Sequence, residues 1–237
     1  MSSTLISEKE SGGLAAAGTR TCAVQHLGLV DFREGWRRQL EFVEAVKRGE
    51  ASDQLIFVEH PATITLGRNA NRSNILASQD ALAERGVALE ETDRGGDVTF
   101  HGPGQIVGYP ILDLKFWRRD VGAYLRALED VLIRALDEFG IKAGRLDRCT
   151  GVWVDGAKIA AIGVHLSRWV TSHGFALNVS TNLDDFGLII PCGITKPVTS
   201  MQRVLGTAPP SGQVTAALAR HFGLVFERVL TDSNGKR

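Results

Sequence analysis

The stretch RGGDVTFHGPGQIVG, residues 94–108, combines closely spaced glycines with interleaved polar side chains, and the rest of the chain is interpreted around it. Five glycines fall within residues 95–108. Glycine loses more conformational freedom on folding than any other residue, so this density needs a reason. The composition leaves two reasons open: a hairpin corner with tight turns, or a loop whose backbone approaches a ligand closely.

Known phosphate-binding motifs do not explain this stretch. A P-loop would read G-x-x-x-x-G-K-[ST], and that pattern occurs nowhere in the chain. Gly102, Gly104 and Gly108 are spaced G-x-G-x-x-x-G with no helical pattern after them, which differs from the dinucleotide-binding fingerprint. His101 can be a base, a residue that orients a ligand, or a structural histidine. It has no H-E-x-x-H context and no close second histidine, so no metal site is predicted.

The sequence on either side predicts short strands and helices in mixed order. Hydrophobic periodicity predicts helices over residues 33–47, 78–86, 120–139 and 212–222. Strands are predicted over residues 54–60, 62–67, 87–93, 97–100, 105–114, 171–180 and 224–230, and a hairpin over 151–167. Ser78 and Asp120 are the expected N-caps of their helices, and Asp155-Gly156 is the expected hairpin turn. Pro110 should limit how its strand pairs.

Neighbouring strands are joined by short connections, so most of their pairing is expected to be antiparallel. The predicted fold class is therefore α+β: a single domain of mixed, largely antiparallel sheets flanked by helices. This domain is expected over residues 21–230. Residues 1–20 and 231–237 are small and polar, and they are expected to form loosely ordered or disordered tails.

The charge balance and the cysteines narrow the functional classes. Lys plus Arg number 27 and Asp plus Glu number 27, so the basic excess of a general nucleic-acid binder is missing. The chain has three cysteines, Cys22, Cys149 and Cys192, and none of them forms a C-x-x-C pair. An odd number of separated cysteines argues against a disulfide framework and a structural zinc site, and it fits a protein of a reducing compartment. The sequence also lacks an apolar run of about 18 residues and a signal-peptide pattern. A cytoplasmic protein without a membrane partner is expected.

Lys158 and Cys192 are the candidate catalytic residues, and each has a structural alternative. Strand alternation places Lys158 on one face with the apolar residues Ala160, Ile162, Val164 and Leu166. Loss of solvation at such a face lowers the pKa of a lysine and suits it to carry protons, but a lysine at a strand end can also simply extend into water. Cys192 lies between Pro191 and Gly193, where a turn would expose its thiol as a nucleophile; the alternative is a small buried apolar residue.

Five segments together resemble the lipoyl(octanoyl) transferases, the octanoyltransferase family of the lipoate pathway. They are EHPATITLGR at 59–68, RGGDVTFHGPGQIVGYPILDL at 94–114, GVWVDGAKIAAIGVH at 151–165, HGFALNVSTNL at 173–183 and PCGI at 191–194. The segments follow the family's order, and the second is long and specific. The 34-residue step from Lys158 to Cys192 also fits the family.

The resemblance implies a fold like the catalytic domain of biotin and lipoate protein ligases. It implies transfer of an octanoyl group to protein, the first step of endogenous lipoate biosynthesis, through a thioester on Cys192 with Lys158 as its partner. Thioester exchange is nearly balanced in energy, so neither ATP nor another cofactor is implied. The implied acyl-binding residues are Arg94, Gly95, Gly96, Asp97, Val98, Thr99, Phe100, His101, Ala161, Ile162, Gly163, Gly174, Phe175 and Ala176.

The resemblance also implies macromolecular partners. The donor would be octanoyl-acyl carrier protein, and the acceptors would be lipoyl domains of 2-oxoacid dehydrogenase E2 subunits and the glycine-cleavage H protein. Acyl carrier proteins are acidic, so a basic patch is expected at the pocket mouth, with Arg118, Arg119 and Arg168 as candidates. No nucleic-acid partner is expected, and the chain is expected to act as a monomer.

Two other functions fit parts of this pattern. An ATP-dependent lipoate-protein ligase on the same fold would need the lysine but no cysteine nucleophile. A non-catalytic module that binds acyl carrier protein or lipoyl domains would need neither residue. The presence of both Lys158 and Cys192 favours the transferase.

Overall fold

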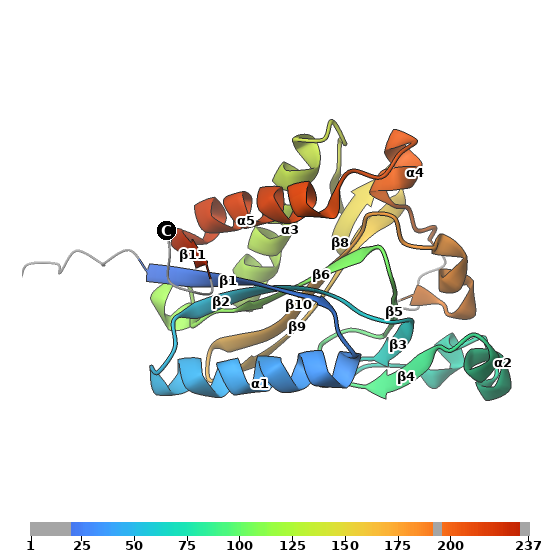
Figure 1. Cartoon of the computed structure of the whole chain (residues 1–237), viewed down its shortest axis with the longest axis horizontal. Helices are drawn as coiled ribbons and strands as arrows, with labels where there is room; N and C mark the ends of the chain where they lie inside the picture. Colours follow the sequence, from blue (N-terminus) through green and yellow to red (C-terminus); the bar gives the residue numbers. More distant parts are fainter. Residues whose placement is uncertain (1–19, 192–195, 233–237) are drawn as a thin grey trace, which may run out of the picture.

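An eight-stranded mixed sheet forms the centre of the computed structural model, which describes residues 20–191 and 196–232 (Figure 1). Its strands are β1 (Arg20–Leu29), β2 (Asp53–Glu59), β6 (Gln105–Ile111), β7 (Gly144–Leu146), β8 (Cys149–Val154), β9 (Ala157–Ser167), β10 (Val170–Asn178) and β11 (Arg228–Asp232). They follow the order β11-β1-β2-β6-β10-β9-β8-β7. Only β1 pairs in parallel, with β2 and β11, and the other neighbours are antiparallel.

A second sheet of three strands lies beside the end of the large one (Figure 1). It contains β3 (Thr63–Leu66), β4 (Ala88–Glu91) and β5 (Val98–His101), in the order β4-β3-β5. The short helix α2 (Gln79–Glu84) and the 3-10 helices η1 (Arg72–Asn74) and η3 (Leu183–Leu188) lie around it. Its hydrophobic side packs on η3, where the rings of Phe100 and Phe186 meet edge to face at 5.5 Å.

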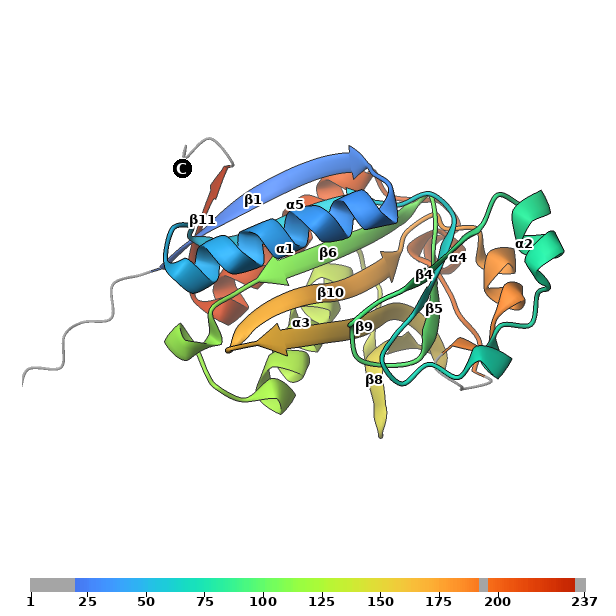
Figure 2. The same cartoon turned by 90° about the horizontal axis from the view of Figure 1, so that it is seen from below.

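Helices cover both faces of the large sheet. Helix α1 (Phe32–Arg48) packs on one face of the sheet against β6 and β10, and it is in front of the sheet in Figure 2. Asp31 caps its first backbone N–H groups. Helices α3 (Val121–Asp137) and α5 (Ser211–Phe226) cover the other face (Figure 1) and enclose the main core with fully buried side chains such as Tyr124 and Phe222. The elements η2 (Leu114–Phe116) and α4 (Met201–Leu205) complete the chain.

Several predictions are confirmed by these elements. The fold is α+β with a largely antiparallel sheet, and the predicted helices at 33–47 and 120–139 are α1 and α3. Ser78 and Asp120 cap their helices as expected. The β8–β9 hairpin turns at Asp155 and Gly156, which both have positive φ values, 48° and 77°.

The prediction missed β7 and α4, and it also differs from the structure near both ends of the chain. Strand β1 was not predicted, and it begins at Arg20, inside the segment assigned to the tail. Residues 224–226 belong to α5 rather than to the last strand, because the buried face of that helix continues to Phe226. Glu227 then ends the helix with a φ of 55°. Strand β11 starts at Arg228 and continues to Asp232, two residues into the predicted tail.

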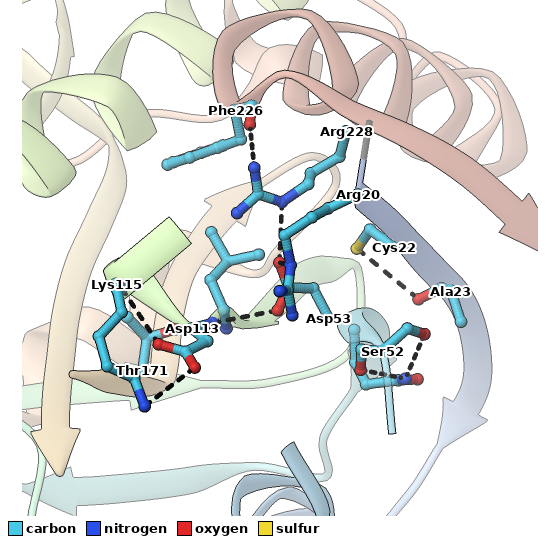
Figure 3. A network of polar contacts seen from close by, with 12 residues as sticks. Arg20, Cys22, Ala23, Ser52, Asp53, Asp113, Lys115, Thr171, Phe226 and Arg228 are labelled. Atoms are coloured by element: carbon cyan, nitrogen blue, oxygen red, sulfur yellow. Dashed lines mark hydrogen bonds and ion pairs between the residues drawn. The ribbon is translucent and has the colours of Figure 1, made fainter. Parts of the chain in front are cut away.

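A buried ion pair joins the two ends of the described chain (Figure 3). Asp53 at the start of β2 is fully buried, and Arg228 of β11 donates through Nε to its Oδ2 at 2.8 Å. The backbone N–H of Asp113 donates to the other carboxylate oxygen at 3.1 Å, and Arg20 Nε lies 3.9 Å from Oδ2. The carboxylate therefore links β1, β2 and β11 to the chain that follows β6.

Candidate active site

A pocket lies where α1, the small sheet and strands β6, β9 and β10 meet. We call it the main pocket. Its lining residues are Phe32, Arg94, Gly95, Gly96, Thr99, His101, Val107, Tyr109, Ala161, Ile162, Gly163, His173, Gly174, Phe175 and Ala176. Eleven of the fourteen acyl-binding residues inferred from the sequence are in this lining.

The other three inferred residues face elsewhere. Side chains alternate along β5, so Thr99 and His101 point into the main pocket while Val98 and Phe100 lie in the core of the small sheet. The carboxylate of Asp97 accepts from the backbone N–H of Asn71, at 2.9 Å, and holds the preceding loop. These three residues support the pocket wall from behind.

Four lining residues were not identified from the sequence: Phe32, Val107, Tyr109 and His173. The signal for two of them was alternation, because Val107 and Tyr109 are on the same face of β6. Phe32 comes from α1, which lies far away in the sequence. His173 directly precedes the predicted Gly174, and its φ of 55° aims its ring in a direction that alternation does not predict.

Residues 94–97 precede β5, and we call them the Gly-rich loop. This loop lies directly on β9 because glycines are present at the contact. Gly95 donates its N–H to Val164 O at 2.8 Å. A Cβ atom added at Gly163 would be 3.0 Å from Gly95 O, closer than nearly all real contacts of this kind. Gly163 pairs with Gly174 across the β9–β10 ladder. The glycines therefore allow backbone to form one wall of the pocket, so the ligand-binding alternative for this loop has a structural basis.

Arg94 is a buried cation in the pocket wall, with 7% of its surface exposed. Its guanidinium donates to Thr65 O at 2.7 Å and to Thr65 Oγ1 at 2.9 Å. It also donates to Gly95 O at 3.1 Å. These bonds fix the loop to β3, and they use donors that would otherwise be desolvated.

His101 is a neutral structural histidine, which resolves the alternatives left by the sequence. Its Nδ1 contacts Gln105 Oε1 at 2.8 Å, and the Gln105 amide is oriented by its own donation to Phe100 O. Nδ1 must therefore carry the proton, and Nε2 accepts from the Thr65 hydroxyl at 3.3 Å. Burial lowers the pKa of His101 to about 3. Both ring nitrogens are engaged, so this residue shapes the pocket rather than moving protons.

Two further histidines support the same wall. His60 donates from Nδ1 to Val30 O and accepts from the Tyr109 hydroxyl, both at 2.6 Å, and burial lowers its pKa. His173 donates from Nε2 to Asp93 at 2.6 Å. Burial lowers the pKa of His173, and the hydrogen bond from His173 lowers the pKa of Asp93. The pocket wall is thus built from neutral, hydrogen-bonded rings.

The register of β8 and β9 changes just beside Lys158. Val152 pairs with Ala160, but Trp153 pairs with Lys158, so Ile159 is an extra residue in β9. This is a β-bulge, and it reverses the alternation of all residues on one side of it. Lys158 is 8% exposed, and its Nζ lies 4.9 Å from the centroid of the Trp153 ring.

The bulge overturns one prediction. Ile159 and Ala160 both lie in the main core, whereas Lys158 lies on the opposite face with Ala161. The prediction that Lys158 shares a face with Ala160, Ile162, Val164 and Leu166 is therefore wrong, because it assumed unbroken alternation. Without the bulge the amine would point into the core beneath α3.

Lys158 lines a second, smaller space that adjoins the main pocket, and we call it the lysine cavity. Its lining is Thr99, Gln105, Lys158, Ala161, Ala176, Asn178, Phe186, Pro191 and Val198. Thr99, Ala161 and Ala176 line both spaces, so the two are adjacent. Cys192 lies outside the described residues, but its neighbour Pro191 is in the lining.

Backbone hydrogen bonds anchor the chain on both sides of residues 192–195. Before them, Ile190 N donates to Asn74 O at 2.7 Å. After them, Lys158 N donates to Pro197 O, and Thr199 N donates to Lys158 O, both at 2.9 Å. The segment that carries Cys192 is therefore attached at its C-terminal side to the backbone of the candidate catalytic lysine.

The expected basic patch does not lie at this end of the molecule. Arg168 is in the β9–β10 turn, ten residues from Lys158 along β9, which is about 33 Å at the usual strand rise. Arg118 and Arg119 follow η2, whose Leu114 N donates to Trp169 O in the same turn. The three candidate arginines therefore lie by the β9–β10 turn and not beside Lys158.

Within residues 20–191 and 196–232, no three His, Cys, Asp or Glu side chains are grouped to hold a metal ion. The same two ranges contain no helix that is both long and apolar enough to cross a membrane.

Comparison with known proteins places this fold among the lipoate-protein ligases. One similar structure comes from a study of a bi-partite lipoate protein ligase and its E2 lipoyl domain from Thermoplasma acidophilum, and it superposes on this chain with a TM-score of 0.72. The alignment covers 90% of this chain and 87% of that one at 16% identity. At this identity the likeness shows the fold alone.

The sequence matches the lipoyl protein ligase A/B catalytic domain over residues 31–223. It is 55% identical over 208 residues to an octanoyltransferase of Solibacter usitatus, covering 88% of this chain and 94% of the relative. It is 54% identical over 214 residues to an octanoyltransferase of Koribacter versatilis, covering 87% and 85%. The chain therefore belongs to the lipoyl protein ligase A/B catalytic domain family and, within it, to the octanoyltransferases. The prediction of an acyltransferase of this family is confirmed.

Proposed function

We propose that this octanoyltransferase takes the octanoyl group from octanoyl-acyl carrier protein, holds it as a thioester on Cys192, and delivers it to a lysine of a lipoyl domain. The observation that carries the proposal is the lysine cavity, where Lys158 and the neighbour of the cysteine, Pro191, line one space. That space adjoins the main pocket, because Thr99, Ala161 and Ala176 line both. The lining of the main pocket is mostly apolar with a few polar groups, as is usual for small-ligand sites.

In the first half-reaction, the Cys192 thiolate attacks the carbonyl carbon of the donor thioester. A new carbon–sulfur bond forms while the carbonyl electron pair moves to oxygen. The intermediate then collapses, the carbon–sulfur bond to the carrier breaks, and the departing thiolate takes a proton from the Lys158 ammonium. The positive charge of Lys158 also favours the thiolate form of Cys192 before attack.

In the second half-reaction, the amine of the acceptor lysine attacks the octanoyl-enzyme. The carbon–nitrogen bond forms, the carbon–sulfur bond to Cys192 breaks, and neutral Lys158 removes a proton from the attacking nitrogen. Lys158 gives up a proton in the first half-reaction and regains one in the second, so the cycle closes without a cofactor. The bulge at Ile159 supports this role, because it brings Lys158 to the pocket side of β9.

The main pocket is proposed to hold the alkyl chain between the Gly-rich loop and the β9–β10 ladder. Ala161, Ala176 and Gly163 leave room along this path. Backbone N–H groups of the Gly-rich loop are also candidates to hold the carbonyl oxygen, but the N–H of Gly95 is already donated to Val164 O. The N–H of Gly95 is therefore not among these candidates, and the loop is also proposed to enclose the chain.

The proposed acceptors are lipoyl domains of 2-oxoacid dehydrogenase E2 subunits and the glycine-cleavage H protein. The Thermoplasma ligase of the same fold was described with an E2 lipoyl domain, which supports this class of acceptor. We propose that the enzyme acts as a monomer. The odd number of cysteines favours a reducing compartment, so we place the reaction in the cytoplasm.

Intact mass spectrometry after incubation with octanoyl-acyl carrier protein tests this function. The wild type is expected to gain one octanoyl group that hydroxylamine removes, as it removes thioesters. Cys192→Ser should gain no octanoyl thioester. Cys149→Ser is the control and should be labelled like the wild type. Lys158→Ala should slow transfer by about 10²–10⁴-fold, the usual contribution of a positioned acid–base group. Full labelling of Cys192→Ser as a thioester would show that the nucleophile is another residue.

The ligase alternative is tested in the same assay. Octanoate and ATP without carrier protein should leave lipoyl domains unmodified if the chain is a transferase. Octanoylation under those conditions would favour an adenylate-forming ligase. Tight carrier binding without any covalent adduct would favour a binding module.

A further inference from the structure

Asn178 ends β10 beside Lys158 and was not among the predicted site residues. It is 4% exposed, and it lies on the same face of β10 as Ala176, two residues earlier. Leu177 pairs with Ala160, so Asn178 is opposite the bulge that directs Lys158 to this face. Asn178 and Lys158 both line the lysine cavity.

The Asn178 amide is held in one orientation. Its Oδ1 accepts from Gln105 Nε2 at 2.9 Å, and its Nδ2 donates to Thr199 O at 3.0 Å. Gln105 cannot turn over, because its Nε2 also donates to Phe100 O and its Oε1 accepts from His101. An amide fixed by a backbone carbonyl at one end and a fixed amide at the other keeps its geometry without a ligand.

Within the described part of the chain, one hydrogen of this amide has no acceptor. A primary amide nitrogen carries two hydrogens, and Thr199 O takes one of them. Across residues 20–191 and 196–232, no second acceptor for Asn178 Nδ2 is found. A buried, preorganised donor on the wall of a reactive cavity is the arrangement that stabilises developing negative charge.

The position of the reacting carbonyl follows from the proposed function, on which this inference rests. In the proposed reaction the alkyl chain occupies the main pocket and the carbonyl is attacked beside Lys158, so the carbonyl carbon lies in the lysine cavity. We infer that Asn178 is a catalytic residue that donates its second Nδ2 hydrogen to the oxyanion of both tetrahedral intermediates. No proton is transferred: the hydrogen bond strengthens as the carbonyl electron pair moves to oxygen, and it weakens when the intermediate collapses.

The inference separates two reactions of the same thiol. Octanoyl transfer passes through an oxyanion, whereas alkylation of Cys192 by iodoacetamide does not, although both need the thiolate. Asn178→Ala should therefore reduce kcat for octanoylation from octanoyl-acyl carrier protein by about 10²–10³-fold, the usual effect of one lost oxyanion donor. Its KM for the carrier protein and the pH profile of its alkylation rate should match the wild type.

Two further variants and a spectrum make the test specific. Asn178→Asp keeps the shape and the acceptor for Gln105 but lacks the donor, so it should be impaired at least as much as Asn178→Ala. Asn182→Ala changes an exposed asparagine four residues later and should react like the wild type. In isotope-edited infrared spectra of the octanoyl-enzyme, the thioester C=O stretch should lie at lower frequency in the wild type than in Asn178→Ala.

Equal losses of octanoylation and alkylation in Asn178→Ala would assign the residue to holding the segment at Thr199, and would overturn the inference. Thr99 lines the same cavity and is the competing donor. The inference would also be overturned if Asn178→Ala kept the wild-type kcat while Thr99→Val lost about 10²-fold in kcat. Absence of a thioester on wild-type Cys192 would overturn the proposed function and this inference with it. A normal wild-type adduct with an unimpaired Asn178→Ala would overturn this inference alone.

Discussion

The burial of His101 is expected to make the stability of the fold depend strongly on pH. Burial lowers the pKa of this residue to about 3 in the folded chain, against about 6.5 in an unfolded chain. Between these values the unfolded state binds a proton that the folded state does not. Stability is therefore complete above pH of about 6.5 and is lost progressively as the pH falls toward 3. From pH 7 to pH 5, this one group should lower the free energy of unfolding by about 2 kcal/mol.

Replacing His101 by asparagine isolates this contribution. The amide nitrogen of Asn can stand where Nδ1 stood and donate to Gln105, but it does not titrate. Urea unfolding of both proteins at pH 7 and pH 5 gives the change in the free energy of unfolding for each. The wild type should lose about 2 kcal/mol more than His101→Asn over this interval. His60 and His173 are present in both proteins, so the difference between the proteins contains the titration of His101 and its coupling to these two neighbours.

The control is the alkaline side of the same experiment. Between pH 8 and pH 9 neither state binds a proton at position 101, so the difference between the two proteins should stay constant there. If the wild type and His101→Asn lost the same free energy of unfolding between pH 7 and pH 5, the histidine would titrate alike in both states. That result would refute the argument from burial and from the hydrogen bonds to both ring nitrogens.

Two further perturbations test the packing. Arg228→Met leaves the fully buried Asp53 carboxylate without its closest cation, so urea unfolding should show a free energy of unfolding lower by about 3–5 kcal/mol. The Asp53→Leu/Arg228→Met double variant should recover this stability, because no buried charge is left unpaired. A decrease of less than about 1 kcal/mol in Arg228→Met would contradict the reasoning. A Cβ at Gly108 would be 2.2 Å from the ring of Phe175, a residue that lines the main pocket. Gly108→Ala should therefore displace that ring, cost about 1–3 kcal/mol and raise the KM for the octanoyl donor. Gly187→Ala, with open space at its Cβ, is the matched control, and equal KM values in the two variants would argue against the mechanism.

Local sequence signals identified much of this fold. The period of apolar residues predicted α1 and α3, and the Asp155-Gly156 turn predicted the β8–β9 hairpin, because these features depend only on neighbouring residues. Strand β1 was missed, and its role depends on pairing with β2 and β11, which are distant in the sequence. No local pattern distinguishes such a strand from an irregular segment.

The site shows the same division. The glycine loop and most of the pocket residues were predicted from segments that resemble a family, whereas the orientation of Lys158 was predicted wrongly. A single bulge at Ile159 reverses the face of the lysine, and nothing in KIAAIG marks the extra residue. Asn178 was not found either, because its role depends on a hydrogen bond to Thr199 and on a cavity formed by other strands.

The position of β1 between β2 and β11 has a consequence for synthesis of the chain. Val24 pairs with Asp232, so partners 208 residues apart in the sequence must meet in one sheet. At about 5–20 residues per second, a ribosome needs on the order of 10–40 s to make the second partner after the first. During that interval one edge of β1 has no partner strand, and the Asp53 carboxylate has no Arg228. The last residues of β11 therefore complete the sheet that the first strand begins, and a nascent chain that lacks them keeps an open edge.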